Sequence, residues 1–415
     1  MCVNRLLGGY RWIILILILA ACGSETPPTP IALLETPTKR ATLLPDDNFS
    51  MCQSIPAAAT SGPEEVSLFP PVNQDDHIRG MDNADVTIIE YGDFQCPGCA
   101  ALSVELSKLE ETFAAELRVV FRQLPLYDIH DKALVAAQAA EVASDEGKFW
   151  EMHDLFFENY GLWNSMTTED FNNWLVMEAV NIGLEPTIFH NKMNSQEIID
   201  RVENLLEQGL SIGLRSTPFL LINGQIYNGP KDYNSLAQII RLISLGKRQF
   251  TACPDMFIDP LKQYIVNLQT EQGDIIIQLF ADKAPVTVNS FVFLARSGWY
   301  DNITFHKVVP GIALTGDPSG TGLGGPGFLY QNEINPGLNF DQPGMVAMMN
   351  SGVNTNGSQF FITSSPQEEL NGYYTIFGEV ISGMDVLSRL TLRNPDVEAN
   401  PPPGDLLIKV TVVEK

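Results

Sequence analysis

The chain has 415 residues, of which 45% are hydrophobic and 18% charged, so it is a globular protein long enough for two or three domains. Its formal net charge of −25 at pH 7 argues against nucleic-acid binding and against a basic membrane-binding face. We therefore expect its partners to be bound through apolar clefts and backbone hydrogen bonds.

Residues 1–21 have the features of a signal peptide. Arg5 and Arg11 form a positively charged region before an apolar run over residues 12–19, which is too short to span a bilayer. The following Leu-Ala-Ala-Cys resembles a bacterial lipobox, which implies that Cys22 carries a lipid and becomes the first mature residue. We expect a lipid-anchored protein outside the cytoplasm of a bacterial cell, where disulfides persist. The alternative is an ordinary cleaved signal peptide with an incidental cysteine.

Residues 22–65 are rich in proline and threonine and show little apolar periodicity. This composition predicts a tether between the membrane and the folded part, reaching about 25–30 Å as a coil. The first folded domain is expected over residues 66–250.

A CxxC motif, Cys96-Pro97-Gly98-Cys99, lies where the strand-like run 86–90 gives way to a helical pattern over residues 100–117. Proline suits the first helical position, and the unpaired N–H groups and dipole of the helix stabilise a thiolate at Cys96. Cys96 is therefore the predicted nucleophile for a disulfide in another protein, and Cys99 the predicted resolving cysteine. Half of a zinc site or a structural disulfide is less favoured, because the chain has no second CxxC and its histidines are scattered singly.

The rest of this domain reads as a mixture of strands and helices. An Asn-Gly turn at residues 223–224 predicts a hairpin. The other expected elements are a strand over 117–125, helices over 132–144, 149–159, 169–182 and 198–212, and a last helix over 234–245.

Four motifs in order, at residues 90–99, 121–125, 147–150 and 216–224, resemble the thioredoxin-like, DsbA-type family. The resemblance implies an α/β thioredoxin-like fold with a helical insertion. It also implies a cis peptide at Thr217-Pro218 beside the cysteines, and a buried acid, Glu90, that assists proton movement at the resolving cysteine. Strongly oxidising members carry a histidine where this chain has Gly98. This departure predicts a less depressed pKa for Cys96, and oxidase, isomerase and reductase all stay open.

After a linker at residues 251–263, the pattern changes to short strands and Gly-rich loops over 264–415. Two strands over 264–280, a helix behind Pro285 and another near 384–389 predict an all-β barrel with two helices. We expect no cofactor or metal, because the Gly-rich loop lacks the Lys-Ser/Thr of a phosphate-binding loop.

Three motifs, at residues 300–311, 316–327 and 354–362, resemble the cyclophilin-type prolyl isomerases. In that family an arginine donates to the prolyl nitrogen and lowers a rotation barrier of about 18–20 kcal/mol. Lys307 takes its place here and lacks the fixed fork of a guanidinium. The resemblance implies a substrate-binding set of Val309, Ile312, Ala313, Thr315, Met349, Asn350, Gln359, Phe361, Leu370 and Tyr374.

Several of these positions depart from the family pattern. Ile312 stands for an aromatic residue, Ala313 for a methionine, Thr315 for a glutamine, Glu369 for an aromatic residue and Tyr374 for a histidine. These departures predict a shallower pocket and weaker catalysis.

Disulfide formation and proline isomerisation are both slow steps in the folding of exported proteins. The sequence thus predicts a membrane-tethered folding factor that acts on unfolded or partly folded exported proteins and needs a redox partner. The alternatives are a disulfide exchange enzyme whose cyclophilin part only binds peptides, and a reductase dedicated to one partner. Cys52 and Cys253 are expected to pair, because free thiols would exchange with the reactive CxxC.

Overall fold

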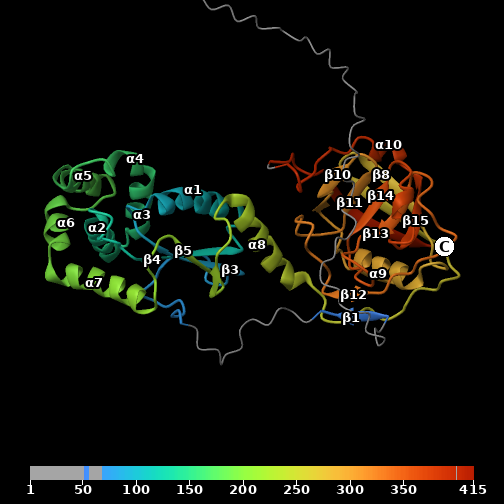
Figure 1. The fold of residues 1–415 in the computed structure, drawn as a ribbon, viewed down its shortest axis with the longest axis horizontal. Coiled ribbons are helices and arrows are strands. Elements are labelled where there is room, and N and C mark those ends of the chain that lie inside the picture. The colour runs from blue at the N-terminus through green and yellow to red at the C-terminus, as the bar shows by residue number, and fades with distance from the viewer. Residues whose placement is uncertain (1–50, 56–67, 399) are drawn as a thin grey trace, which may run out of the picture. The chain divides into compact units, whose positions relative to one another are not determined.

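The computed structural model describes residues 51–55, 68–398 and 400–415 (Figure 1). The predicted signal peptide, Cys22 and most of the predicted tether lie outside these residues. Within them, no helix is both long and apolar enough to cross a membrane.

The N-terminal domain is built on a mixed sheet, which in the described part of the chain has the strand order β2-β4-β3-β5-β6. Only β3 and β4 run parallel. The central strand β3 is buried on both faces, which explains its nearly continuous apolar sequence. The bounds are β2 (His77–Gly80), β3 (Val86–Gly92), β4 (Leu117–Gln123), β5 (Phe219–Ile222) and β6 (Gln225–Tyr227).

Helices cover both faces of this sheet. On one face α1 (Pro97–Thr112) and α8 (Tyr233–Leu245) pack through residues such as Leu106 and Ile240 against Ile88 of β3. On the other face Leu206 of α7 (Gln196–Ser211) packs with Val120 of β4. Helix α1 ends five residues earlier than its pattern suggested, because the chain turns at Phe113 into β4.

The segment between β4 and β5 is a helical insertion with an aromatic core of its own, including Phe156, Trp163 and Phe171. Figure 1 shows its helices gathered beside the sheet. They are α2 (Ala133–Asp145), α3 (Phe149–Glu158), α4 (Tyr160–Trp163), α5 (Thr168–Asn181), α6 (Pro186–Met193) and α7. The short helices α4 and α6 were not predicted, because each is too short to show a clear apolar period. The predicted α/β fold with a helical insertion is confirmed.

The C-terminal domain is an antiparallel sheet that curls into a half-barrel, as predicted. In the described residues its strand order is β10-β11-β14-β13-β15-β8-β7-β16-β9. Helix α9 (Pro285–Arg296) contributes Phe291 to the core, and α10 (Met384–Leu387) is shorter than expected. The strands are β7 (Tyr264–Thr270), β8 (Gly273–Leu279), β9 (Ile303–Thr304), β10 (Lys307–Val309), β11 (Ile312–Thr315), β13 (Met345–Met348), β14 (Phe360–Thr363), β15 (Ile376–Ser382) and β16 (Leu406–Glu414).

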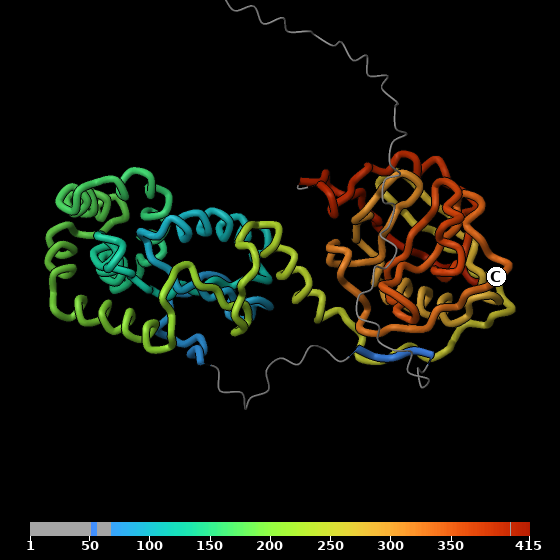
Figure 2. Tube along the Cα trace, in the orientation of Figure 1, coloured from blue at the N-terminus to red at the C-terminus, as the bar shows by residue number. Residues whose placement is uncertain are grey.

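A short strand from the predicted tether belongs to this C-terminal domain. Strand β1 (Cys52–Ser54) pairs antiparallel with β12 (Phe328–Tyr330), as the blue segment in Figure 2 shows. Three residues are too few to show the alternation that identifies a strand in a sequence. This segment precedes the N-terminal domain in the sequence, yet it packs on the C-terminal domain.

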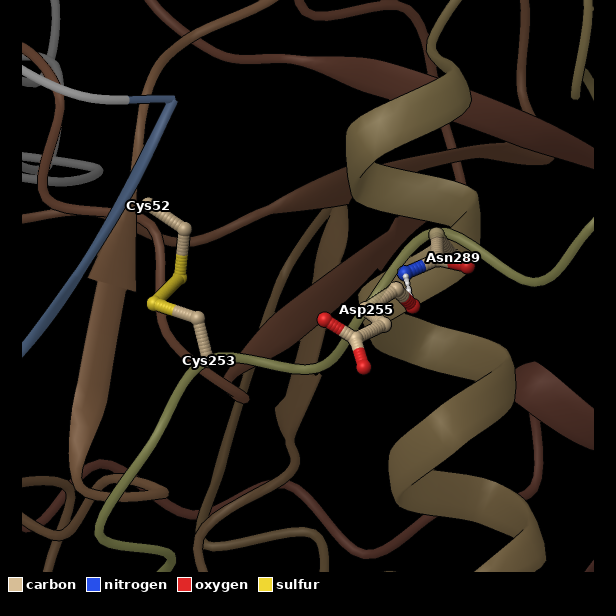
Figure 3. Close-up of a disulfide and its surroundings, with 4 residues drawn as sticks. All are labelled: Cys52, Cys253, Asp255 and Asn289. Carbon is tan, nitrogen blue, oxygen red and sulfur yellow. Dashed lines mark hydrogen bonds between the residues drawn. A yellow bond between two sulfur atoms is a disulfide. The ribbon is translucent and has the colours of Figure 1, made fainter.

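The segment assigned to the end of the first domain and the linker also packs there. A disulfide joins Cys52 to Cys253, with 6.1 Å between their Cα atoms (Figure 3). Asn289 of α9 then holds the following residues: its Nδ2 donates to the carbonyl of Asp255 at 2.9 Å and its Oδ1 accepts from the N–H of Phe257. Ile258 enters the hydrophobic core.

Candidate functional sites

The CxxC motif lies at the junction between β3 and α1. Cys96 is the N-cap of α1, with an extended backbone, and Pro97 is the first helical residue. The structure holds Cys96 and Cys99 as free thiols. Cys96 is 6% exposed and Cys99 is fully buried. The outer sulfur is therefore the one that another protein can reach.

The two thiols are strongly different in acidity. A hydrogen bond from the Cys99 thiol, helped by the backbone N–H groups of Gly98 and Cys99, lowers the pKa of Cys96 to about 5 against the opposing effect of burial. Burial raises the pKa of Cys99 well above its ordinary value. The expectation that Gly98 leaves the pKa of Cys96 less depressed than in strongly oxidising family members stays a prediction. The stabilising donors are backbone groups and a neighbouring thiol, not a charged residue.

The Thr217-Pro218 segment lies against the motif, and its peptide bond is cis. The Cys96 thiol donates to the carbonyl of Thr217 at 3.3 Å. A Cβ atom on residue 98 would lie 2.9 Å from Cδ of Pro218. The glycine between the cysteines thus permits the close approach of this loop.

Glu90 of β3 lies beneath the cysteines. It is 1% exposed, and its Oε1 has no hydrogen-bond partner among the residues described. Burial raises its pKa to about 8, although a hydrogen bond from Cys99 opposes this shift. The side chain can therefore keep its proton at neutral pH and exchange it with the buried thiol of Cys99.

The buried Asp93 and the half-buried His130 form a pair that was not predicted from the sequence. The Asp93 carboxylate lies 2.8 Å from Nδ1 of His130 and accepts from the N–H groups of Gln95 and Leu126. The N–H of Asp93 points to the sulfur of Cys99 at 3.5 Å. Asp93 lies within the motif of residues 90–99, so the sequence could have marked it as a candidate site residue. An isolated histidine 31 residues after Cys99 gave none.

The second site lies on one face of the half-barrel's sheet. Lys307 pairs across the sheet with Leu314, which pairs with Phe361. Residues directly opposite in neighbouring strands share a face. Because Phe361 and Leu314 lie outside the core cluster that contains Phe360 and Ile362, this shared face is turned away from that core, and we call it the cleft face.

The same register corrects two residues of the predicted substrate-binding set. Ala313 pairs with Ile362 and Thr315 with Phe360, so both side chains point into the core. Thr315 is fully buried and donates to the carbonyl of Thr304 at 2.9 Å. Leu314 lies on the cleft face instead. Matching the motifs residue by residue could not show this, because a shift of one position reverses the face of a strand.

Aromatic and aliphatic side chains surround Phe361. Phe340 stacks on it with ring centroids 5.7 Å apart, and Tyr374 meets it edge-on at 5.3 Å. Ile312 and Leu370 of the predicted pocket are both buried. Phe340 was not singled out from the sequence, because it lies between motifs.

Polar residues of the predicted set hold loops in place. Nδ2 of Asn350 donates to the carbonyl of Tyr373 at 3.2 Å. Nε2 of Gln359 donates to the carbonyls of Gly322 and Gly324. Val309 and Met349 are half-buried at the ends of β10 and β13.

Lys307, the cation on the cleft face, has a carboxylate partner. The ammonium of Lys307 forms an ion pair with the carboxylate of Asp396, on the loop before β16. This loop is attached to β10 by Arg393, which exchanges two backbone hydrogen bonds with Val308, each of 2.9 Å.

The chain thus combines a helix-terminal dithiol in an α/β domain with a sheet face that carries Lys307 and Phe361 on an antiparallel half-barrel. A model of the family described as thioredoxin matches residues 72–241. A model described as cyclophilin type peptidyl-prolyl cis-trans isomerase matches residues 265–412.

Individual relatives match the C-terminal domain. The peptidyl-prolyl cis-trans isomerase-like 1 of Gibberella zeae is 43% identical over 152 residues, which cover 36% of this chain and 94% of that protein. The peptidyl-prolyl cis-trans isomerase ppi1 of Schizosaccharomyces pombe is 44% identical over 140 residues, or 33% of this chain and 90% of that protein. A solved cyclophilin type isomerase of Cryptosporidium parvum is 36% identical, with a TM-score of 0.34, covering 37% of this chain and 98% of that one. The chain belongs to the cyclophilin-type peptidyl-prolyl cis-trans isomerase family, to which it adds a thioredoxin-like domain.

Proposed function

We propose that this protein is a folding factor that exchanges disulfides at Cys96 and Cys99 and isomerises prolyl bonds at the cleft that contains Lys307. The observation that carries the first activity is the opposite shift of the two thiol pKa values, downward for Cys96 and upward for Cys99. The second activity is supported by the family of the C-terminal domain.

Thiol–disulfide exchange would proceed in two balanced steps. The Cys96 thiolate attacks one sulfur of a disulfide in the partner, which forms a mixed disulfide and releases the other sulfur as a thiolate. The ionised form of Glu90, which has released its own proton to solvent, then takes the proton of Cys99, and the resulting thiolate attacks the sulfur of Cys96, which releases the partner's second thiolate. The reverse sequence oxidises a dithiol in the partner.

The acidity of Cys96 favours this reverse direction. A low pKa stabilises the reduced form of the dithiol, so its disulfide is a stronger oxidant, and it makes Cys96 a good leaving group. We infer that the domain is a DsbA-type oxidant of exported proteins. A reductase dedicated to one partner is the competing direction, and the reduction potential of the Cys96–Cys99 pair separates the two.

Prolyl isomerisation would depend on Lys307. Its ammonium can donate to the prolyl nitrogen, which weakens the amide resonance that holds the bond planar. Phe361, Phe340, Leu370 and Tyr374 offer an apolar pocket for the proline ring. The lysine is a point charge and is paired with Asp396, which supports weak catalysis.

A peptide-binding module with little isomerase activity is the second candidate. The ion pair between Lys307 and Asp396 favours it, because a substrate must separate the two charges before the ammonium can reach a prolyl nitrogen. We also propose that a lipid on Cys22 anchors the protein to a bacterial membrane outside the cytoplasm. Labelling with a radioactive fatty acid in wild type and Cys22→Ala tests this anchor.

The decisive experiment traps mixed disulfides. A Cys99→Ser protein should accumulate disulfide-linked adducts with exported proteins, and a Cys96→Ser protein should accumulate few. Equal trapping by both variants would contradict the assignment of Cys96. Refolding of a scrambled protein that also needs proline isomerisation, with each domain inactivated in turn, then separates the two activities.

A further inference from the structure

The Gly-rich loop of residues 316–327, which connects β11 to β12, is bound from two sides. On its inner side Nε2 of Gln359 donates to the carbonyls of Gly322 at 3.0 Å and Gly324 at 2.9 Å. Gln359 immediately precedes β14, two residues before Phe361. Within the loop, the fully buried carboxylate of Asp317 accepts from the N–H of Gly324 at 3.0 Å.

On its outer side the loop is held by two short segments, residues 51–55 and 249–253, which we call the clamp segments. Nε2 of Gln249 donates to the carbonyl of Gly325 at 2.9 Å. The N–H of Phe250 donates to the carbonyl of Pro326 at 2.8 Å. The N–H of Ile55 donates to the carbonyl of Gly327 at 2.8 Å. The carbonyls of residues 324–327 are thus bound in sequence, the first by Gln359 and the next three by the clamp segments.

The contact between loop and clamp is close. Gly327 has a positive φ of 90°, and a Cβ there would lie 2.3 Å from the carbonyl oxygen of Phe250. The ring of Phe250 packs on Phe293 and Trp299, with centroids 4.8 and 6.0 Å away. A displacement of the clamp segments therefore has to move residues 325–327.

The disulfide between Cys52 and Cys253 joins the two clamp segments (Figure 3). Segment 51–55 contributes only a three-residue strand, β1, to the domain. A strand this short is marginal by itself, because few hydrogen bonds compensate the entropy of fixing it. The covalent bond keeps it beside β12 by closing the long loop between the cysteines.

We propose that the Cys52–Cys253 disulfide positions Gln359 through this loop, so that the redox state of the bond regulates substrate binding at the cyclophilin cleft. A dithiol reductant supplies two electrons and two protons: the sulfur–sulfur bond breaks, two thiols form at Cys52 and Cys253, and the reductant becomes a disulfide. Cys52, Cys253 and Gln249 are positioning residues in this scheme. The regulatory effect rests on the proposed isomerase function and on the place of Gln359 in the substrate-binding set that the family resemblance implies.

The first test measures structure and does not depend on activity. Amide hydrogen exchange of Phe250 and Ile55, whose N–H groups donate to the loop, and of Gly324, whose N–H donates to Asp317 within it, is followed in the full chain before and after dithiothreitol, and in a Cys52→Ser/Cys253→Ser protein. Reduction should accelerate exchange about fivefold, the factor that corresponds to one hydrogen bond of ordinary net strength. The double serine variant should exchange fast with or without dithiothreitol. Because this variant retains Cys96 and Cys99, it also controls for reduction of the CxxC pair.

The second test measures isomerisation of a short Ala-Pro peptide. Reduction should raise KM about fivefold and change kcat little, because Gln359 is expected to bind the ground state and the transition state alike. A Gln249→Ala protein, which keeps the disulfide, should show a smaller increase of about twofold. The measurements on the reduced wild type and on Gln249→Ala can still be made if the double serine variant does not fold.

Equal loop exchange in the oxidised and reduced protein would overturn the proposal, and so would unchanged KM values alongside measurable activity. If the oxidised wild type has no isomerase activity, the proposed function fails. The exchange experiment then still decides whether the disulfide positions the loop, and the same peptide's binding affinity replaces KM as the measure of the site.

Discussion

Replacing Glu90 by glutamine should stabilise the N-terminal domain at alkaline pH and slow the resolving step of disulfide exchange. The carboxyl group is buried, and burial raises its pKa from 4.5 to about 8. An amide has nearly the same shape but cannot ionise or accept the proton of Cys99. The variant should therefore gain stability and accumulate mixed disulfides that the wild type resolves.

The sign of the stability effect follows from the direction of the pKa shift. Between pH 4.5 and 8 the folded protein keeps a proton that the unfolded chain has lost. The free energy of unfolding thus contains a favourable term that is fully present below the unfolded value and is lost as the pH rises through the folded value. At about 1.4 kcal/mol for each pH unit, the loss reaches at most about 5 kcal/mol. Glu90→Gln should not show this loss.

Cys96 has the opposite effect and has to be removed from the measurement. Its pKa is lowered to about 5, so its thiolate stabilises the reduced protein as the pH rises. In the oxidised protein neither Cys96 nor Cys99 titrates, whereas the burial of Glu90 persists. The comparison is therefore made on the oxidised form.

The assay is urea unfolding at about pH 5, 7 and 9, which brackets the raised pKa. Fluorescence of Trp150, Trp163 and Trp174 reports on the N-terminal domain. Trp299 of the C-terminal domain is replaced by phenylalanine in both proteins. The two free energies of unfolding should agree at the lowest pH and diverge in favour of Glu90→Gln at the highest. Parallel pH profiles for the two proteins would refute the reasoning.

Three further predictions concern the two sites. Alkylation of Cys96 by iodoacetamide should reach half its maximal rate near pH 5, and a midpoint near 9 would contradict the hydrogen bonds to its thiolate. Lys307→Ala should lower kcat for a prolyl peptide by about 10²-fold, as expected for the loss of an electrostatic donor, and Lys307→Arg should raise it. If wild type, Lys307→Ala and Lys307→Arg all lack measurable isomerase activity, the binding-module function is favoured. Gly98→Ala should lower the free energy of unfolding by about 1–3 kcal/mol in urea titrations, because the added methyl group meets Pro218. An unchanged free energy would show that this loop yields without cost.

The sequence was informative where the chemistry of a site is local. Cys96, Cys99 and Pro97 follow one another at a helix start, and the structure brings the distant Thr217 to Cys96 as the motifs implied. The partner of Asp93 could not be found in this way. His130 reaches it through tertiary packing alone, and an isolated histidine in a sequence has no distinguishing feature.

At the prolyl site, the sequence did not show which side chains of β11 face the site. The motifs around Lys307 and Phe361 located the site. Which side chains of β11 lie on the cleft face depends on the hydrogen-bonding register of β11 with β14. Motif order does not contain that register, so Ala313 and Thr315 were assigned to the cleft and Leu314 was not.

The pairing of β1 with β12 has a consequence for the order in which the protein is completed. Strand β1 is synthesised before the N-terminal domain, and its partner strand is synthesised after it. The Cys52–Cys253 bond spans 201 positions of the chain, so its closure carries the entropy of a long loop unless the intervening domain has already become compact. Because domains generally fold as units during synthesis, the N-terminal domain is expected to fold first within this loop. A substitution that slows its folding therefore lengthens the time during which β12 lacks its neighbour, although it alters no residue of the C-terminal domain.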